Sequence, residues 1–413
     1  MRVLVVGGGI GGLALAQGPV RHGLGVTVVE PDTDLAATGG YKLHLATPAL
    51  RALRGLLPPD LVELLFGSAA ATDGFSLAVR DHRGRLLVRA AEGSGGTALD
   101  VDRVALRLLL AHGLEDHLTL GRRCLDYRHD GEEVEATLDD GTRLRADLLV
   151  LATGAGSPLT DRLAGGLTSV PVGLTGVAGR TPAGDLPGPT RALLAEGSLL
   201  AVGPGGVGLF AAPHDPGGQA AVVTRRSIAT TREPVAIWGL IAVEDALPAR
   251  PDRLDRSELV QVAARALGVR RWSPALTGLV EAAATASVAA FRLVAADPGR
   301  LAPWAASRVT ALGDAVHAMP PTGGQGAATA ILDAAELTAR LVDAERGETT
   351  TLMAVHDFEQ GMRARGAAAV RESLQPIGWI RGGAGPVASG ALRLGLPAAA
   401  AAAQVWRRCG GRA

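Results

Sequence analysis

The first thirty residues follow the order strand, glycine-rich turn, helix, strand, and this order restricts the fold more than any other segment. The run "RVLVV" at 2–6 is apolar and β-branched and ends at Gly7, as a buried parallel strand does. Gly7, Gly9 and Gly12 form G-x-G-x-x-G between that strand and a helix expected from about residue 11 to residue 22. Such glycines let the backbone turn tightly and approach a pyrophosphate, and the helix N-terminus attracts the anion. The segment predicts a Rossmann-like α/β domain that binds a dinucleotide.

Glu30 ends the next strand, "GVTVVE", 18 residues after the last glycine of the motif. A carboxylate at this position accepts hydrogen bonds from an adenosine ribose and repels a 2′-phosphate. The full strand–turn–helix–strand–Glu context makes the motif specific, although it does not choose between NAD and FAD. Pro19, inside the expected helix, is predicted to kink or shorten it.

The composition of the 413 residues, 47% hydrophobic and 20% charged, is typical of a folded protein with a large core. Its 41 basic and 41 acidic residues cancel, so there is no electrostatic basis for binding nucleic acid or an anionic membrane. Cys124 and Cys409 are too far apart to form a metal or redox motif. Because the chain has neither signal-peptide features nor an apolar run that could span a bilayer, we expect a cytoplasmic protein. We also expect a monomer or homodimer.

The rest of the chain alternates between sheet and helix patterns. Residues 119–151 alternate in polarity around two Asp-Gly turns, which predicts an antiparallel meander that returns to a buried strand. Residues 168–225 hold short apolar runs broken by Gly and Pro, which predicts a β-sheet lobe. A buried strand at 308–314 precedes a helix, and the segment from Thr351 onward reads mainly as helix.

A second glycine-rich segment, "GDAVHAMPPTGGQG", occupies residues 313–326 directly after the predicted strand. An Asp after a strand can place its carboxylate on the ribityl hydroxyls of a flavin dinucleotide. A glycine turn that opens a helix can aim backbone N–H groups at the electron-rich edge of the flavin ring. The two loops together therefore favour FAD, because its two ends need separate binding turns.

These segments resemble the class A, single-component FAD-dependent monooxygenases, the aromatic and polyketide hydroxylases related to p-hydroxybenzoate hydroxylase. Gly313-Asp314, the two prolines and Gly-Gly-Gln-Gly are similar to the family's flavin-ribityl motif, and Arg103 in "VDRVALRLLL" matches an Arg of a family helix. The resemblance covers about residues 1–380. It implies an FAD-binding domain of the p-hydroxybenzoate hydroxylase type with an inserted β-sheet substrate lobe and C-terminal helices.

The resemblance also implies roles for individual residues. Asp314 would hold the ribityl chain, Arg103 the pyrophosphate region, and Pro320 and Pro321 would lie close to the flavin ring, with Pro320 also facing the substrate. His317, in the middle of the turn, is interpreted as structural. The other residues expected to bind FAD are Gly7, Gly9, Gly12, Glu30, Gly313, Gly324 and Gly326.

The domain boundaries that follow interleave two lobes. We predict an FAD-binding domain made of residues 1–72, 98–175 and 285–350, a substrate lobe made of residues 73–97 and 176–284, and a C-terminal helical region at 351–413.

One motif departs from the family pattern. Where relatives carry Asp-Gly after the mid-chain strand, this chain has Thr153-Gly154 in "ADLLVLATGAGSPLT". Thr keeps a hydroxyl but loses the charge. This loss weakens the expectation that NAD(P)H serves as a transient reductant. Three functions therefore stay open. One is a monooxygenase that hydroxylates or epoxidises a bulky, mostly apolar molecule through a flavin hydroperoxide, as in polyketide tailoring. Another is a non-redox cyclase or isomerase that keeps FAD as a scaffold. The third is a flavin-binding protein without catalysis that acts as a scaffold or small-molecule binder.

Candidate substrate residues lie in two segments. In "GGYKLHLA" the residues Tyr41, Lys42 and His44 alternate with Leu, and His44 is the candidate base for deprotonating a phenol or enol. The alternative is that Lys42 and His44 form a solvated face. Phe210 and His214 in "GLFAAPH" are expected to line the pocket from the substrate lobe. Because aromatic residues make up only 3% of the chain, this pocket must be built mainly from aliphatic side chains.

Overall fold

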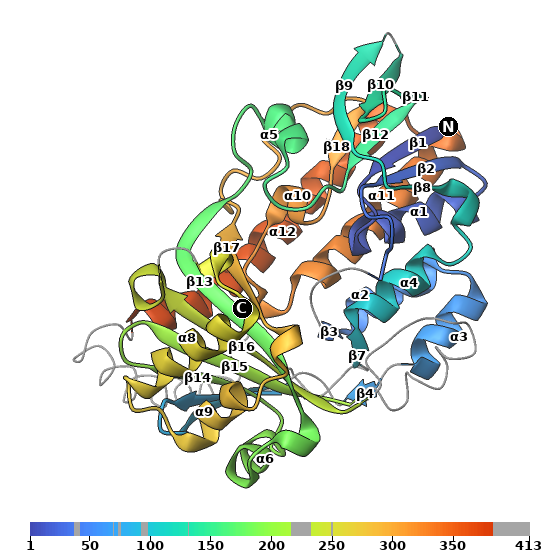
Figure 1. Ribbon diagram of the computed structural model, residues 1–413. Helices are drawn as coiled ribbons and strands as arrows, with labels where there is room; N and C mark the ends of the chain where they lie inside the picture. The colour runs from blue at the N-terminus through green and yellow to red at the C-terminus, as the bar shows by residue number, and fades with distance from the viewer. Residues whose placement is uncertain are drawn as a thin grey trace, which may run out of the picture.

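A five-stranded parallel sheet contains the strands that precede both glycine-rich segments (Figure 1). The computed structural model describes residues 1–36, 42–68, 70–72, 76–91, 98–130, 132–215, 233–248 and 251–382. The strand order is β18 (Val309–Ala311), β12 (Leu148–Leu151), β1 (Arg2–Val6), β2 (Gly25–Glu30) and β8 (Leu118–Leu120). β1 therefore has β2 on one side and β12 on the other, so a topological switch point lies beside β1. The predicted α/β class is confirmed.

Helices cover this sheet and pack on one another. They are α1 (Ile10–Arg21), α2 (Thr47–Leu56), α3 (Pro59–Ser68), α4 (Arg103–Ala111) and α11 (Gly326–Glu345). α1 runs two residues past Pro19, so the expected shortening is small. The reason is that Pro19 lies in the last turn, where its missing N–H removes only one intrahelical hydrogen bond.

A three-stranded antiparallel sheet confirms the predicted meander. Its order is β11 (Arg143–Ala146), β10 (Glu133–Leu138) and β9 (Cys124–Asp130), and the chain then returns through β12 to the parallel sheet. The short helices α5 (Pro158–Ala164) and α10 (Asp314–His317) follow β12 and β18.

The second lobe is a seven-stranded sheet with helices on both faces. Its order is β17 (Ala289–Ala295), β13 (Val170–Pro182), β16 (Val235–Val243), β15 (Val207–His214), β14 (Ser198–Gly203), β5 (Ser76–Asp81) and β6 (Leu86–Ala91). One face packs on α6 (Gly188–Leu194), α8 (Arg256–Gly268) and α9 (Pro274–Glu281). The other face is covered in part by the end of α12 (Thr351–Gly382), as Figure 1 shows.

A small antiparallel sheet lies between the two larger sheets (Figure 1). It has the order β3 (Lys42–Leu45), β7 (Ala98–Asp102) and β4 (Ala70–Thr72). The strand expected around residues 220–225 and the chain beyond residue 382 lie outside the described residues. Among the described residues, no helix is long and apolar enough to cross a membrane. The domain boundaries stay a prediction.

Candidate functional site

Three turns leave the parallel sheet side by side at one edge. Val6, Leu151 and Ala311 occupy matching positions at the carboxyl ends of β1, β12 and β18. Neighbouring strands are about 4.8 Å apart, so β1 and β18 are separated by about 10 Å. The two glycine-rich loops, more than 300 residues apart in the sequence, therefore begin at the same sheet edge.

The glycines of the first turn differ in why they are needed. Gly7 has φ +114°, and a Cβ at Gly12 would lie 1.9 Å from the Gly7 carbonyl oxygen, so the protein itself requires both. Gly9 has φ −76° at the start of α1, and a Cβ there would meet no described atom within 4 Å. Gly9 therefore leaves space above the helix N-terminus, as the close approach of a pyrophosphate requires.

A buried network of hydrogen bonds holds this turn in place. Glu30 is buried, and its Oε2 accepts the Gly8 N–H at 2.5 Å while its Oε1 accepts the Asp32 N–H at 2.9 Å. Arg107, on α4, donates from Nε to the Gly8 carbonyl oxygen at 2.8 Å and from Nη1 to Asp32 Oδ2 at 2.8 Å. Sequence reasoning missed Arg107, although it lies four residues after Arg103 on the same helix face. The ribose contact expected of Glu30 stays a prediction.

The second turn is fixed by an ionic network. Gly313 has φ +66°, and its N–H donates to Asp333 Oδ2 at 3.1 Å. The same oxygen lies 2.5 Å from His317 Nε2, and Arg365 donates to Asp333 Oδ1 from Nε at 3.0 Å and Nη2 at 2.7 Å. Burial disfavours the charge, yet His317 and Arg365 hold the pKa of Asp333 below its ordinary value. Asp333 in turn raises the pKa of His317 against the effect of burial. His317 is thus buried inside this network, and its structural role stays a prediction.

Asp314 and Arg103 lie close enough to affect each other's charge. Desolvation by the surrounding protein raises the pKa of the Asp314 carboxyl, and Arg103 opposes this shift. Burial and the neighbouring Arg107 lower the pKa of Arg103, and Asp314 opposes that shift. The Asp314 side chain is nevertheless accessible to solvent. A carboxylate that is crowded by protein yet open on one side suits a ligand hydroxyl.

The glycine turn that opens α11 lies next to Asp314. A Cβ at Gly326, the first residue of α11, would lie 3.5 Å from Asp314 Oδ1. Pro320 is buried, whereas Pro321 and Gly324 are exposed, and Gly324 has φ +64°. The N-terminus of a 20-residue helix thus begins beside the accessible carboxylate. Open glycines, helix N-termini and this carboxylate fit the phosphate and ribityl groups of a flavin dinucleotide.

The third turn, after β12, contains the residue that departs from the family pattern. Thr153 Oγ1 lies 3.2 Å from Thr160 Oγ1, so its hydroxyl has a partner within the protein. Gly154 and Gly156 both have positive φ angles, +76° and +71°, and a Cβ on either would meet no described atom within 4 Å. This segment is therefore a further open glycine turn at the same sheet edge.

The small sheet carries a charged face. Lys42 Nζ lies 2.7 Å from Asp100 Oδ2, and His44 Nδ1 lies 2.9 Å from Asp100 Oδ1. Burial opposes ionisation, but His44 and Lys42 lower the pKa of Asp100. The two predicted residues are therefore joined by a carboxylate that the sequence did not single out. Tyr41 lies outside the described residues.

The lobe formed by the seven-stranded sheet reaches the same charged face through β15. His214 is buried, and its Nε2 lies 3.9 Å from Asp102 Oδ2 at the end of β7. Burial lowers the pKa of His214, which favours its neutral form. Phe210, four residues earlier on β15, faces the same side of the seven-stranded sheet and is partly exposed. The structure thus brings the predicted residues of the two lobes to one region.

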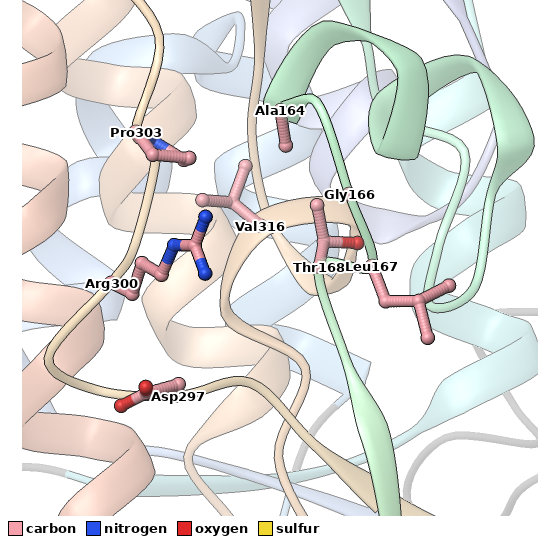
Figure 2. A pocket seen from close by; sticks show the side chains of 9 residues that line it. Ala164, Gly166, Leu167, Thr168, Asp297, Arg300, Pro303 and Val316 are labelled. Carbon is pink, nitrogen blue, oxygen red and sulfur yellow. The ribbon is translucent and has the colours of Figure 1, made fainter.

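A pocket of about 70 Å³ lies elsewhere, between the loop after α5 and the loop after β17 (Figure 2). Figure 2 shows Arg300 and Val316 beside Thr168 and Leu167. No residue predicted to bind FAD or substrate lines this pocket.

Comparison with known proteins gives concordant results. Residues 246–373 match the family model described as FAD binding domain. The chain is 27% identical over 400 residues to the dual O-methyltransferase/FAD-dependent monooxygenase CTB3 of Cercospora beticola, covering 88% of this chain and 44% of that protein. It is 28% identical over 353 residues to a chloroplastic zeaxanthin epoxidase of Oryza sativa subsp. japonica, covering 82% of this chain and 48% of that protein. The chain thus spans less than half the length of these curated relatives.

Solved structures agree with the fold. A putative FAD-containing monooxygenase from Photorhabdus luminescens subsp. laumondii superposes with a TM-score of 0.78 and 26% identity, covering 91% of this chain and 97% of that chain. Klebsiella pneumoniae HpxO, complexed with FAD and uric acid, superposes with a TM-score of 0.73 over 96% of this chain and 92% of that chain. At 19% identity, the second likeness concerns the fold alone. These comparisons bear out the resemblance of the chain to the class A FAD-dependent monooxygenases related to p-hydroxybenzoate hydroxylase.

Proposed function

We propose that this chain is an FAD-dependent monooxygenase that hydroxylates or epoxidises a bulky, mostly apolar small molecule of the kind modified in polyketide tailoring. The observation that carries the proposal is the convergence of the three glycine turns after β1, β12 and β18 at one sheet edge. Gly9 leaves space there that no described protein atom fills, and Asp314 offers an accessible carboxylate beside Arg103.

FAD would be held from both ends. The turn at Gly7, Gly9 and Gly12 and the N-terminus of α1 would receive the pyrophosphate, with Arg103 in the same region. Asp314 would accept hydrogen bonds from the ribityl chain, and the turn from Gly324 to the start of α11 would face the ring. When bound, FAD supplies the oxygen-transfer chemistry, and the protein supplies position, exclusion of water and proton transfer.

The proton-transfer role falls to His44. A carboxylate 2.9 Å from Nδ1 favours the tautomer that carries its proton on Nδ1, which leaves Nε2 as the acceptor. Such an imidazole can take the proton of a substrate phenol or enol at neutral pH. Asp100 is then a positioning residue, since it orients the ring, and Lys42 helps to keep Asp100 ionised.

The substrate class and the reductant are parts of the same proposal. CTB3 carries a monooxygenase function in its name, and zeaxanthin epoxidase is named for an epoxidation. These relatives do not favour the non-redox cyclase or isomerase. NAD(P)H is the proposed reductant.

The test is a pair of glycine substitutions in the purified chain. Gly9→Ala places a methyl group where the pyrophosphate would lie, so we expect at least a tenfold loss of FAD affinity. The melting temperature without FAD should stay within about 1 °C of the parent value, because the φ of Gly9 suits alanine. Gly188→Ala, at the first residue of α6 and also with open space around it, should change neither property.

The FAD proposal fails if Gly9→Ala binds FAD as tightly as the parent chain. The flavin absorbance then separates the monooxygenase from the functions in which FAD is only a scaffold. Anaerobic bleaching on addition of NADPH is expected of a monooxygenase. A flavin that stays oxidised with NADPH or NADH, with and without candidate substrates, would refute it in favour of the scaffold role.

A further inference from the structure

An interior strand of the seven-stranded sheet, β16, borders a part of one sheet face that is open to solvent. β16 lies between β13 and β15, and its side chains alternate between the two faces of the sheet. Ala236, Trp238, Leu240 and Ala242 point into the core under α8 and α9. The residues between them, including Gly239, therefore point to the opposite face.

One end of that opposite face is closed. Ile241 packs with Ile380 of α12 in a buried cluster. Its neighbour on β15 is Gly208, where a Cβ would lie 2.8 Å from Ile380 Cδ1. Its neighbour on β13 is Gly176, where a Cβ would lie 2.2 Å from the ring of Phe291. The space beside each of these two glycines is therefore filled by a neighbouring side chain.

The next row across the sheet is open. It consists of Ala178 on β13, Gly239 on β16 and Phe210 on β15, and we call these three residues the open row. All three are partly exposed, whereas every other residue from Val235 to Ala242 is buried. A Cβ at Gly239 would meet no described atom within 4 Å. Solvent therefore reaches three adjoining strands in the middle of a sheet, where a monomeric protein normally places a covering layer.

Polar groups border the open row on its other side. The next row holds Ile237 and Arg180, and His214 follows on β15. Arg180 and Asp102 both influence the charge on His214, so the three lie close together. His214 Nε2 is buried and has no hydrogen-bond partner among the described residues. Asp102 Oδ2, 3.9 Å away, is too distant for a hydrogen bond, so this buried imidazole nitrogen calls for a ligand group or an ordered water.

We infer that Gly239 determines substrate specificity by forming the floor on which an apolar ring of the substrate lies, between Phe210 and Ala178. The substrate class is a flat, polycyclic apolar molecule with one acidic or hydrogen-bond-accepting oxygen, which Arg180 and His214 receive. This inference rests on the proposed function, because it assigns the substrate of that same site.

The absence of a side chain at Gly239 also has a cost that favours a functional reason. Glycine in a strand interior weakens the strand, because it packs nothing and loses more backbone entropy on folding. A Cβ at this position would meet no described atom within 4 Å, and β-branched residues such as valine are favoured in strands. The fold alone therefore gives no reason for glycine here, whereas a flat ligand does.

The experiment uses two fluorescent probes with the same polycyclic skeleton, anilinonaphthalene sulfonate and the uncharged phenylnaphthylamine. We expect Gly239→Val to lower the affinity for both probes at least tenfold, with unchanged FAD absorbance and an unchanged or higher melting temperature. Arg180→Met should lower the affinity for the sulfonate at least tenfold and leave the uncharged probe within about twofold. Gly184→Val, at another glycine with open space around it, is the matched control and should change neither affinity.

The inference is overturned if Gly239→Val binds both probes as the parent chain does, or if the parent chain binds neither. Equal losses for the two probes in Arg180→Met would overturn the assignment of the polar end. FAD content, measured in the same samples, separates this failure from failure of the proposed function. A chain that binds FAD but shows no effect of Gly239→Val sinks only the inference, whereas a chain without FAD sinks the proposed function.

Discussion

Replacing Asp333 by Asn tests whether the ionic network below the second turn holds that turn in place. Asp333 is fully buried and accepts hydrogen bonds from the Gly313 N–H, from His317 and twice from Arg365. The variant keeps the shape but removes the negative charge that lies in direct contact with the buried His317. Removing one partner of a buried pair costs about 3–5 kcal/mol. With an unfolding entropy of roughly 2.1 cal/mol/K per residue over 413 residues, the melting temperature should fall by roughly 3–6 °C.

The assay is thermal unfolding of the parent chain and Asp333→Asn as a function of pH. In the parent chain the raised pKa of His317 contributes stability that is fully present below about pH 6.5 and is lost as the pH rises through the folded value. The lowered pKa of Asp333 contributes stability present above about pH 4 and lost as the pH falls through its folded value. Without the carboxylate, burial favours neutral His317, so the variant should instead gain stability as the pH rises through the imidazole range.

Asp343→Asn is the matched control, because Asp343 lies near the end of α11, the helix that also holds Asp333. It should change the free energy of unfolding by less than about 0.5 kcal/mol. The reasoning is refuted if Asp333→Asn costs less than about 1 kcal/mol, or if its stability follows the parent's pH dependence in parallel. FAD affinity provides a second readout. Because Gly313 loses its carboxylate acceptor, the turn carrying Asp314 should loosen and FAD should bind more weakly.

Three further outcomes are expected. Gly12→Ala, unlike Gly9→Ala, should lower both FAD affinity and melting temperature, since its Cβ would lie 1.9 Å from the Gly7 carbonyl oxygen; an undisturbed melting curve would contradict this. In steady-state kinetics His44→Gln should lower kcat about 10²–10⁴-fold and remove the acidic limb of the pH–rate profile, whereas Asp100→Asn should lower kcat less and keep that limb; a larger loss in Asp100→Asn would reverse the two roles. Cys124 is buried and the pKa of its thiol is raised to about 11, so peptide mass spectrometry should find it unalkylated by iodoacetamide at pH 8 until the chain is denatured, and rapid labelling of the native chain would refute this.

Local patterns predicted the elements that bear the cofactor site. The glycine motif, the β-branched runs and the helical periodicity after residue 326 each involve residues close in sequence, and β1, α1, β2 and α11 lie where these patterns placed them. The meander at β9–β11 follows from its two Asp-Gly turns in the same way. That β18 and β12 join β1 in one sheet could only be expected from the resemblance to a family.

The residues that sequence analysis missed contact partners that are far away along the chain. Arg107 reaches the Gly8 carbonyl oxygen 99 residues away, and Asp100 meets His44 across 56 residues. An Arg in a leucine-rich helix or an Asp in a short strand has no local signal that names its partner. Only the packing of α4 against the first turn, and of β7 against β3, gives these side chains their roles.

The two positions that carry the proposals share one physical property. Gly9 is the only residue from Val3 to Ile10 that is not buried, and Gly239 is the only such residue from Val235 to Ala242. Neither has a positive φ angle, and at neither would a Cβ meet a described atom, so the backbone conformation and the packing would both accept alanine. Gly7 and Gly12, in contrast, are explained entirely by the protein around them. A glycine that the fold does not require, set in a buried stretch, marks a surface kept clear for a ligand. On this argument the sheet edge at Gly9 is kept clear for the pyrophosphate, and the sheet face at Gly239 is kept clear for the substrate. The charged face of Lys42, His44 and Asp100 belongs to the small sheet, which lies between the two larger sheets.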